Sequence, residues 1–176
     1  MFIRALMLTT ALMIAAPAFA QDNGSAATTP AAAASTTDPA QFAAMASVSN
    51  LFELETSTMA KERATSEEVK AFADQMIADH TKAAQEMTAA AQEEGAAPAT
   101  ALDDRHQQIV DELEGLEGEA FDAAYIQAQA QAHDEAVALF EGYSTDGAEG
   151  PLKAFATKTL PTLKQHQEHV HTLAGH

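Results

Sequence analysis

The 176-residue sequence contains no cysteine and no tryptophan, and it has only 2 tyrosines. Without cysteine the chain has neither a disulfide nor a thiolate ligand, so its stability depends on packing and any metal site must use histidine, carboxylate or methionine. Basic residues are also scarce, with 9 lysines and arginines against 26 acidic residues and a formal net charge of −17. This charge repels phosphate backbones, so we expect no nucleic-acid partner.

Long apolar runs are missing except near the N-terminus. Residues 5–16 are apolar except for Thr9 and Thr10, they follow Arg4, and Ala18-Phe19-Ala20 completes a small-x-small cleavage pattern. This pattern is typical of a secretory signal peptide, and the run is shorter than the roughly 20 residues that span a bilayer. We therefore predict a signal peptide over residues 1–20, no transmembrane segment in the mature chain, and export to the periplasm or, alternatively, to the extracellular space.

The segment after the predicted cleavage site has little charge and few large apolar side chains. Residues 21–37 consist mainly of Ala, Thr, Ser and Pro, which bury too little apolar surface to offset the entropy of ordering the chain. We predict that this segment is a disordered leader. The remaining residues, 38–174, are predicted to form one helical domain.

Helix signals recur through this domain, whereas no segment of useful length alternates polar and apolar residues as a strand would. Asp38-Pro39 places a capping residue before a proline at the first helical position, and Thr65-Ser66-Glu67-Glu68 is a capping box. The predicted class is all-α, a four-helix bundle with one extra short helix between the second and third long helices. The long helices are expected over about 39–63, 66–95, 119–141 and 151–173, and the short helix over about 102–113.

Each of the last three long helices carries one histidine on its apolar stripe. His80, His133 and His166 follow the three-and-four spacing of the core positions. If the second and third long helices are antiparallel, His80 and His133 share a layer about 14 residues from their joined ends. If the last two long helices end where they are predicted to end, His166 lies about 10 Å from that layer along the bundle, unless a kink at Pro161 or an uneven loop brings it closer.

These histidines form a candidate site for a transition metal. Neutral imidazole is a good ligand for zinc, copper, nickel or iron, and bundles build such sites from facing helices. The first helix adds Glu53 or Glu55, which cannot both point fully inward. The alternative is that each histidine is a buried polar residue that bonds to a neighbouring group and binds no metal. One ion can join the three rings only if they lie within about 8 Å of one another.

Other catalytic patterns are missing from the sequence. The ferritin di-iron motif needs Glu three residues before a site histidine, but Ile77 and Ala130 stand there. Neither a Ser-His-Asp order nor a glycine-rich phosphate loop is present, so we assign no catalytic residue and favour a binding role over an enzyme. Asp79 is a candidate acceptor for a site histidine, whereas Asp122, in the first turn of a helix, is expected to be a solvated surface charge.

Four stretches, taken together and in order, resemble one known family. They are Asn50-Leu51-Phe52-Glu53-Leu54-Glu55, Val69-Lys70-Ala71-Phe72-Ala73 continuing to Met76-Ile77-Ala78-Asp79-His80, Phe121-Asp122-Ala123-Ala124-Tyr125, and Leu160-Pro161-Thr162-Leu163 ending in His166. The family is an exported domain of unknown function (DUF4142), often labelled predicted outer membrane protein. The resemblance implies a ferritin-like bundle and export, with Glu53, His80, His133 and His166 at positions matching the family pattern. It implies no reaction.

Two functions are therefore open for this sequence. The first is an exported binding protein that holds a transition metal or a small ligand through its core histidines. The second is a non-enzymatic structural or interaction module of the cell envelope, with a protein partner and a role in stress or assembly. The second predicts an exposed apolar patch larger than a typical monomer has.

Overall fold

The computed structural model describes residues 36–175, and all regular structure in this range is helical. The helices are α1 (Pro39–Arg63), α2 (Glu67–Glu94), α3 (Asp104–Glu114), α4 (Gly118–Asp146) and α5 (Pro151–Ala174). The predicted all-α class is confirmed for these residues. The predicted signal peptide and nearly all of the predicted leader lie outside them. Within residues 36–175, no helix combines the length and apolarity needed to cross a membrane.

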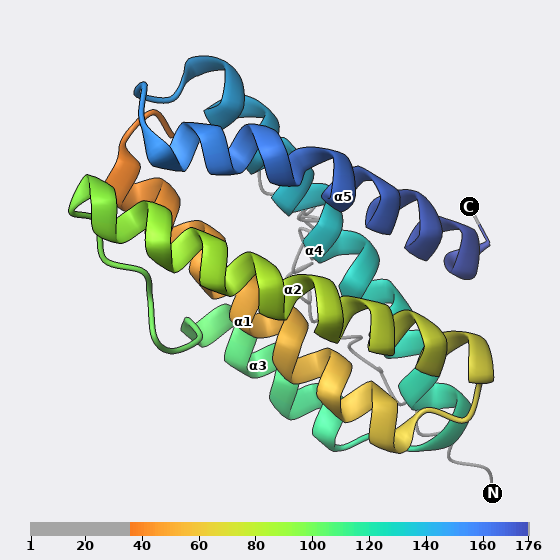
Figure 1. The fold of residues 1–176 in the computed structure, drawn as a ribbon. Helices are drawn as coiled ribbons and strands as arrows, with labels where there is room; N and C mark the ends of the chain where they lie inside the picture. Colours follow the sequence, from red (N-terminus) through yellow and green to blue (C-terminus); the bar gives the residue numbers. More distant parts are fainter. Residues whose placement is uncertain (1–35, 176) are drawn as a thin grey trace, which may run out of the picture. The chain divides into compact units, whose positions relative to one another are not determined.

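The four long helices pack side by side as a helical bundle, and α3 lies along α1 and α4 (Figure 1). α1 packs against α2 and α4, and α5 packs against the same two helices. Figure 1 also shows that α2 and α4 run in the same direction, because α3 returns the chain to the end of the bundle where α2 begins. The antiparallel arrangement assumed for these two helices from the sequence is therefore wrong. The long helices that pack directly against each other are antiparallel: α1 with α2 and α4, and α5 with α2 and α4.

Capping residues set the helix starts as the sequence predicts. Asp38 Oδ1 accepts the backbone N–H groups of Ala40 and Gln41 at the start of α1. Ser66 Oγ accepts the backbone N–H of Val69 at the start of α2. These side chains satisfy amide groups that have no partner inside the helix.

The end of α4 differs most from the prediction. The helix passes through Gly142 and ends at Asp146 instead of near residue 141. Tyr143 in this extension is fully buried and stacks on Phe42 of α1, with ring centroids 3.9 Å apart. Burial of the aromatic ring offsets the roughly 1 kcal/mol cost of a glycine inside a helix, so the extra residues stay helical.

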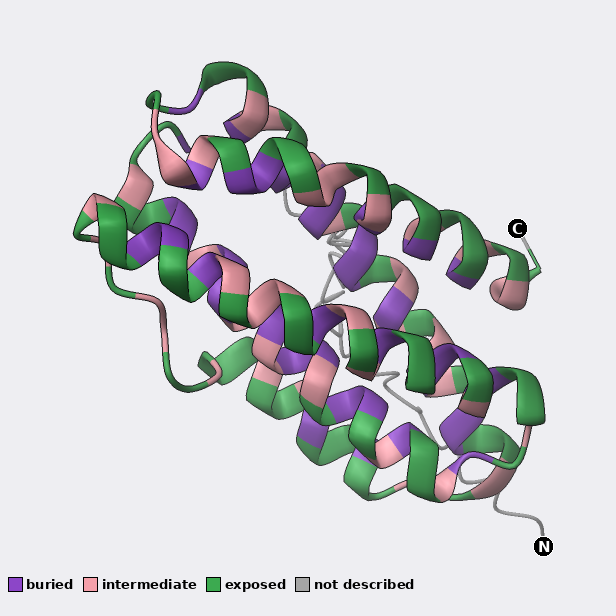
Figure 2. Cartoon of the chain, viewed as in Figure 1, coloured by how far each residue is buried: buried purple, intermediate pink, exposed green. Residues whose placement is uncertain are grey.

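Two large apolar clusters and one small one form the core, and Figure 2 shows the buried residues on the helices. Along the helices, a layer of buried polar side chains lies between the two large clusters. The first apolar cluster includes Phe42, Met87, Phe140, Tyr143, Leu152, Phe155 and Leu163. The second apolar cluster includes Val69, Phe72, Met76, Leu113, Phe121, Tyr125 and Val170. In α2, His80 stands between Met76 of the second cluster and Met87 of the first. Buried polar side chains thus divide the core near its middle.

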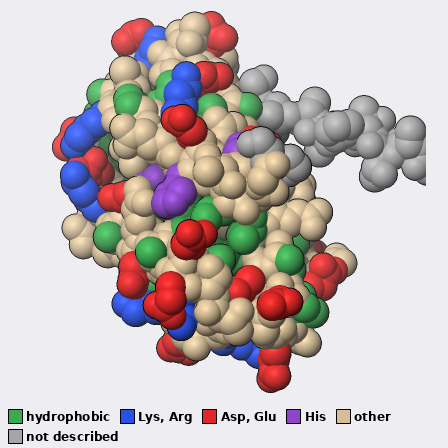
Figure 3. All heavy atoms as spheres, turned by 90° about the vertical axis from the view of Figure 1, so that its right-hand side faces the viewer, with side chains coloured by type: hydrophobic (Ala, Val, Ile, Leu, Met, Phe, Trp, Pro, Cys, Tyr) green, Lys and Arg blue, Asp and Glu red, His purple; other side chains and the backbone are tan. Residues whose placement is uncertain are grey.

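Most charged side chains of the described residues lie on the outside of the bundle. Figure 3 shows one face, where acidic side chains are spread widely among fewer basic ones. The full sequence carries a net charge of −17. Such a surface creates a negative potential that raises the local concentration of cations.

Asp122 is not the solvated surface charge expected from the sequence. Its residue is 8% exposed, and its carboxylate accepts bonds from the Thr65 backbone N–H, the Thr65 hydroxyl and the Ser66 backbone N–H at 2.6 to 3.1 Å. Burial raises the pKa of Asp122, but these hydrogen bonds outweigh burial and leave it below its ordinary value. Asp122 therefore fixes the start of α2 to the N-terminal part of α4.

Replacing this carboxylate should destabilise the fold. We expect Asp122→Ala to lower the free energy of unfolding by about 2–3 kcal/mol at pH 7, because buried amide and hydroxyl donors lose a charged acceptor. A carboxyl group with a lowered pKa in the folded state stabilises the fold above its unfolded pKa, which is about 4. The difference in unfolding free energy between Asp122→Ala and wild type should therefore shrink as pH falls below about 4. Urea unfolding measures both effects.

Glu119→Ala is the matched control, because Glu119 is an exposed acidic residue in the first turn of α4, three residues before Asp122. It should change the free energy of unfolding by less than about 0.5 kcal/mol. Equal effects of the two substitutions would contradict a specific role of Asp122.

Candidate metal centre

His80, His133 and His166 meet in the polar layer between the two apolar clusters. Their ring centroids are 5.9 Å apart for His80 and His133, 5.6 Å for His80 and His166, and 5.5 Å for His133 and His166. All three residues are buried. The rings thus lie inside the limit of about 8 Å within which one ion can join them.

Helix lengths and directions place the three rings at one level. From the helix starts at Glu67 and Gly118, the helical rise puts His80 about 20 Å along α2 and His133 about 23 Å along α4. Because α2 and α4 run in the same direction, these positions differ by about 3 Å along the bundle.

The prediction that His166 lies about 10 Å from this layer is wrong, and the extension of α4 explains why. With α4 ending at Asp146 and α5 starting at Pro151, His133 lies about 20 Å before the end of α4 and His166 about 23 Å after the start of α5. These two positions again differ by about 3 Å. α5 remains helical through Pro161, so the level of His166 follows from the helix ends.

One nitrogen of each imidazole bonds to an oxygen at the edge of the site. The pairs are His80 Nδ1 with Asn50 Oδ1 at 3.1 Å, His133 Nδ1 with the Gln129 carbonyl at 2.9 Å, and His166 Nε2 with Asp79 Oδ2 at 2.9 Å. Each of these oxygens is an acceptor, so each of these nitrogens carries the ring hydrogen and donates it. We call them the outer nitrogens. Their bonds set the tautomer of each neutral ring.

The other nitrogens of the three rings are free acceptors. His80 Nε2, His133 Nε2 and His166 Nδ1 are buried and have no hydrogen-bond partner. One ring nitrogen from each histidine can be chosen so that all three lie within 4.8 Å of one another. Nitrogens bound tetrahedrally to one ion at about 2.1 Å are about 3.4 Å apart, so the rings need to close by at most about 1.4 Å.

Burial keeps the three rings in the neutral form that binds metals. It lowers the pKa of His133 to about 4. Burial, and then the two neighbouring imidazoles, lower the pKa of His80 well below its usual range. Burial also lowers the pKa of His166, although its bond to Asp79 partly opposes the shift. At pH 7 the free nitrogens therefore keep their lone pairs.

The two candidate carboxylates of α1 have different surroundings. Glu55 is exposed, and the structure does not bring it to the histidines. Glu53 is 1% exposed, and its Oε1 lies 3.6 Å from the outer nitrogen of His133. Glu53 therefore sits behind a site histidine and not among the free nitrogens. Neither of its carboxyl oxygens has a hydrogen-bond partner, and burial raises its pKa to about 8.

Asn50 and Gln129 are site residues that the sequence analysis does not select. Asn50 had a detectable signal, because it is a polar residue four positions after Ala46 and three before Glu53 on one face of α1. Gln129 had none, because its contribution is a backbone carbonyl. Its side chain instead donates to Thr56 Oγ1 at 3.0 Å, which holds this part of α4 against α1.

Three neutral nitrogen ligands without sulfur suit zinc, cobalt, nickel or copper(II), and they leave at least one coordination position open. Hydrogen bonds from the outer nitrogens to oxygen acceptors are the usual support of metal-bound histidines, because they orient the ring and raise its basicity. The buried residues present therefore fit a mononuclear transition-metal ion.

Comparison with known proteins identifies a family for this chain. The profile of a family described as Domain of unknown function (DUF4142) matches residues 24–173. None of the curated proteins and none of the solved structures matches significantly. The family description names no activity, so a function must be inferred from the geometry of the histidines.

The buried Glu53 carboxyl gives a pH-dependent prediction for the metal-free protein. A carboxyl whose folded pKa is about 8, against an ordinary 4.5, loses its contribution to stability as pH rises through this interval. Glu53→Gln has no such loss. We expect its stability relative to wild type to increase by about 2–4 kcal/mol between pH 5 and pH 8, measured by urea unfolding in the presence of a chelator.

Histidine titration is common to both proteins and cancels in this comparison. Glu55→Gln, the exposed counterpart on the same helix, should follow wild type at every pH. If the stability difference between Glu53→Gln and wild type does not vary with pH, Glu53 is ionised in the folded protein.

Proposed function

Because the chain belongs to the family called Domain of unknown function (DUF4142), we propose its function from the buried histidines: it is an exported protein that binds one transition-metal ion through His80, His133 and His166. The observation that carries the proposal is the set of three buried ring nitrogens without hydrogen-bond partners. Each of the three rings is held by its other nitrogen.

A purely structural role explains this arrangement poorly. A buried acceptor without a partner costs about 1–3 kcal/mol, and three of the buried atoms without partners are histidine nitrogens from different helices. The three rings also offer nitrogens that lie within 4.8 Å of one another. A metal ion would satisfy all three at once, which favours metal binding over a merely buried polar cluster.

The charge around the proposed ion also supports this function. Asp79 lies 2.9 Å from the outer nitrogen of His166, so its carboxylate would partly balance a divalent cation across the ring. Glu53 would contact the site only through His133. We assign Glu53 the role of a positioning residue and propose no metal bond to it or to the exposed Glu55.

The proposal includes a ferritin-like bundle and an address outside the cytoplasm. Four long helices with the short α3 between α2 and α4 support the first. The signal-peptide pattern of residues 1–20 supports the second. The interaction-module alternative is less favoured, because the three histidine nitrogens without partners are buried and do not face a partner at the surface.

Metal analysis tests the proposal directly. Protein purified from the periplasm, or reconstituted from the metal-free form, should bind about one equivalent of Zn²⁺ or Co²⁺ and show a raised Tm. His133→Ala should weaken binding by more than about 100-fold, because the loss of a ligand exceeds the 10–100-fold effect of an outer partner. Isothermal titration calorimetry measures this difference.

The exposed His169 on α5 is the matched control, and His169→Ala should bind like wild type. Less than about a tenth of an equivalent of metal, together with an unchanged Tm on adding zinc, copper or iron, would refute the proposed function.

Asp79 supplies a separate prediction. Asp79→Asn should keep the fold but weaken Co²⁺ binding by about 10-fold, because the amide replaces a charged acceptor behind His166. Asp74→Asn, a surface aspartate of the same helix paired with Lys61, should leave the affinity unchanged. Equal Co²⁺ affinities of the two variants would show that Asp79 does not support the site.

A further inference from the structure

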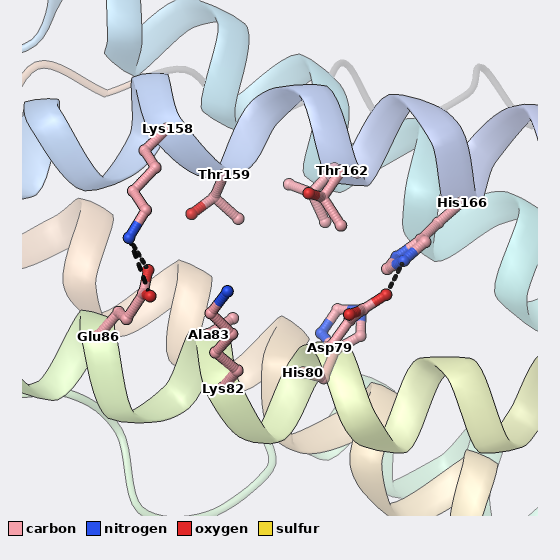
Figure 4. A pocket seen from close by; sticks show the side chains of 10 residues that line it. Asp79, His80, Lys82, Ala83, Glu86, Lys158, Thr159, Thr162 and His166 are labelled. Atoms are coloured by element: carbon pink, nitrogen blue, oxygen red, sulfur yellow. Dashed lines mark hydrogen bonds and ion pairs between the residues drawn. The ribbon is translucent and has the colours of Figure 1, made fainter.

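A pocket between α2 and α5 leads from the surface to two of the site histidines (Figure 4). Its volume is about 80 Å³. The outer end is formed by the exposed Lys82 and Lys158, and the inner end by His80 and His166, which are 5% and 1% exposed. A ligand in this pocket would therefore reach the edge of the triangle of imidazoles.

The pocket has room for a small molecule only. About 10–15 Å³ of such volume is enough for one water, so the pocket holds several waters or one small ligand. A second cavity of about 20 Å³ shares His80, Ala83, Thr159 and Leu163 with the pocket. The small size of both spaces favours a small ligand over a large one.

Two hydroxyl groups in the pocket wall are available to a ligand. The side chains of Thr159 and Thr162 extend from α5 toward α2 (Figure 4), and neither has a hydrogen bond to another described residue. Other threonines of α5 bond to their own helix, as Thr157 does to the Lys153 carbonyl at 2.8 Å. Thr159 and Thr162 thus differ from them in having donors directed at open space.

Two acidic and two basic side chains line the pocket, and a lysine at its outer end is exposed. Both acidic side chains of the lining are engaged, because Glu86 accepts two bonds of 2.9 Å from Lys158 and Asp79 bonds to His166. Lys82 has no ion pair among the described residues and remains as a cation at the outer end. Three neutral imidazoles would leave the positive charge of a divalent ion largely uncompensated. An anionic ligand on the ion would balance this charge.

We propose that this pocket admits a small monovalent inorganic anion, which binds the metal at the position left open by His80, His133 and His166. The inference rests on the proposed metal-binding function and assigns its exogenous ligand. Thr159 and Thr162 donate hydrogen bonds to the anion, and Lys82 attracts it to the entrance. A large polyanion is excluded by the size of the pocket and by the acidic surface around it.

Azide is a suitable probe because it is a linear monovalent anion of three atoms. In the Co²⁺-loaded protein, azide should change the visible absorption of the metal with saturation at one equivalent bound. Thr162→Val should weaken azide binding by about 10-fold or more, since a single hydrogen bond to a charged ligand is lost. Lys82→Gln should weaken it by a few-fold at low salt and less at high salt.

Ala83→Leu tests the route itself, because Ala83 lines both the pocket and the deeper cavity. The larger side chain should block azide by more than 10-fold while Co²⁺ affinity stays within about 3-fold of wild type. Thr157→Val, on the same helix but outside the pocket, is the control and should bind azide normally. Circular dichroism checks the fold of each variant.

The outcomes separate the two proposals. If Co²⁺ binds but azide leaves its spectrum unchanged, or if none of the pocket variants weakens azide binding, the anion site is refuted and the metal site stands. If Ala83→Leu does not fold, Thr162→Val and Lys82→Gln decide the matter, since neither replaces a core side chain. If Co²⁺ does not bind at all, the proposed function itself is refuted and the anion site with it.

Discussion

Three N–H···O bonds at the edge of a buried layer control the chemistry of this bundle. They hold His80, His133 and His166 by their outer nitrogens and so direct the other nitrogens into the core, where they have no partners. Unsatisfied acceptors destabilise a protein interior. The two apolar clusters on either side of the layer must therefore stabilise the bundle enough to keep the rings in place, and a bound ion would add to this stability.

The position of that layer depends on contacts far from it. The short helix α3 returns the chain so that α2 and α4 run in parallel (Figure 1), and Asp122 ties their starts together. At the other end, stacking of Tyr143 on Phe42 accompanies the extension of α4. A shift of one helical turn, about 5.4 Å, in either contact would separate the imidazoles beyond the reach of a single ion.

The bundle combines an acidic exterior with an interior that is neutral at pH 7. The negative surface concentrates cations near the protein, whereas burial keeps the histidines neutral and holds Glu53 in its protonated form up to a pKa of about 8. Two lysines mark the outer end of the pocket between α2 and α5. We therefore propose that the same molecule attracts a metal cation and, at one place on its surface, admits an anion.

Helix starts and the buried faces of His80, His133 and His166 were predictable from the sequence, because capping and the 3.6-residue period are local properties. The sequence left Glu53 and Glu55 as alternatives, since both lie near the inner face of α1. Only the tertiary structure placed Glu53 behind His133 and left Glu55 exposed. It also set the direction of α4 relative to α2, and it paired Asp79 with His166 instead of with its sequence neighbour His80. These outcomes depend on contacts between residues distant in sequence, which no local pattern encodes.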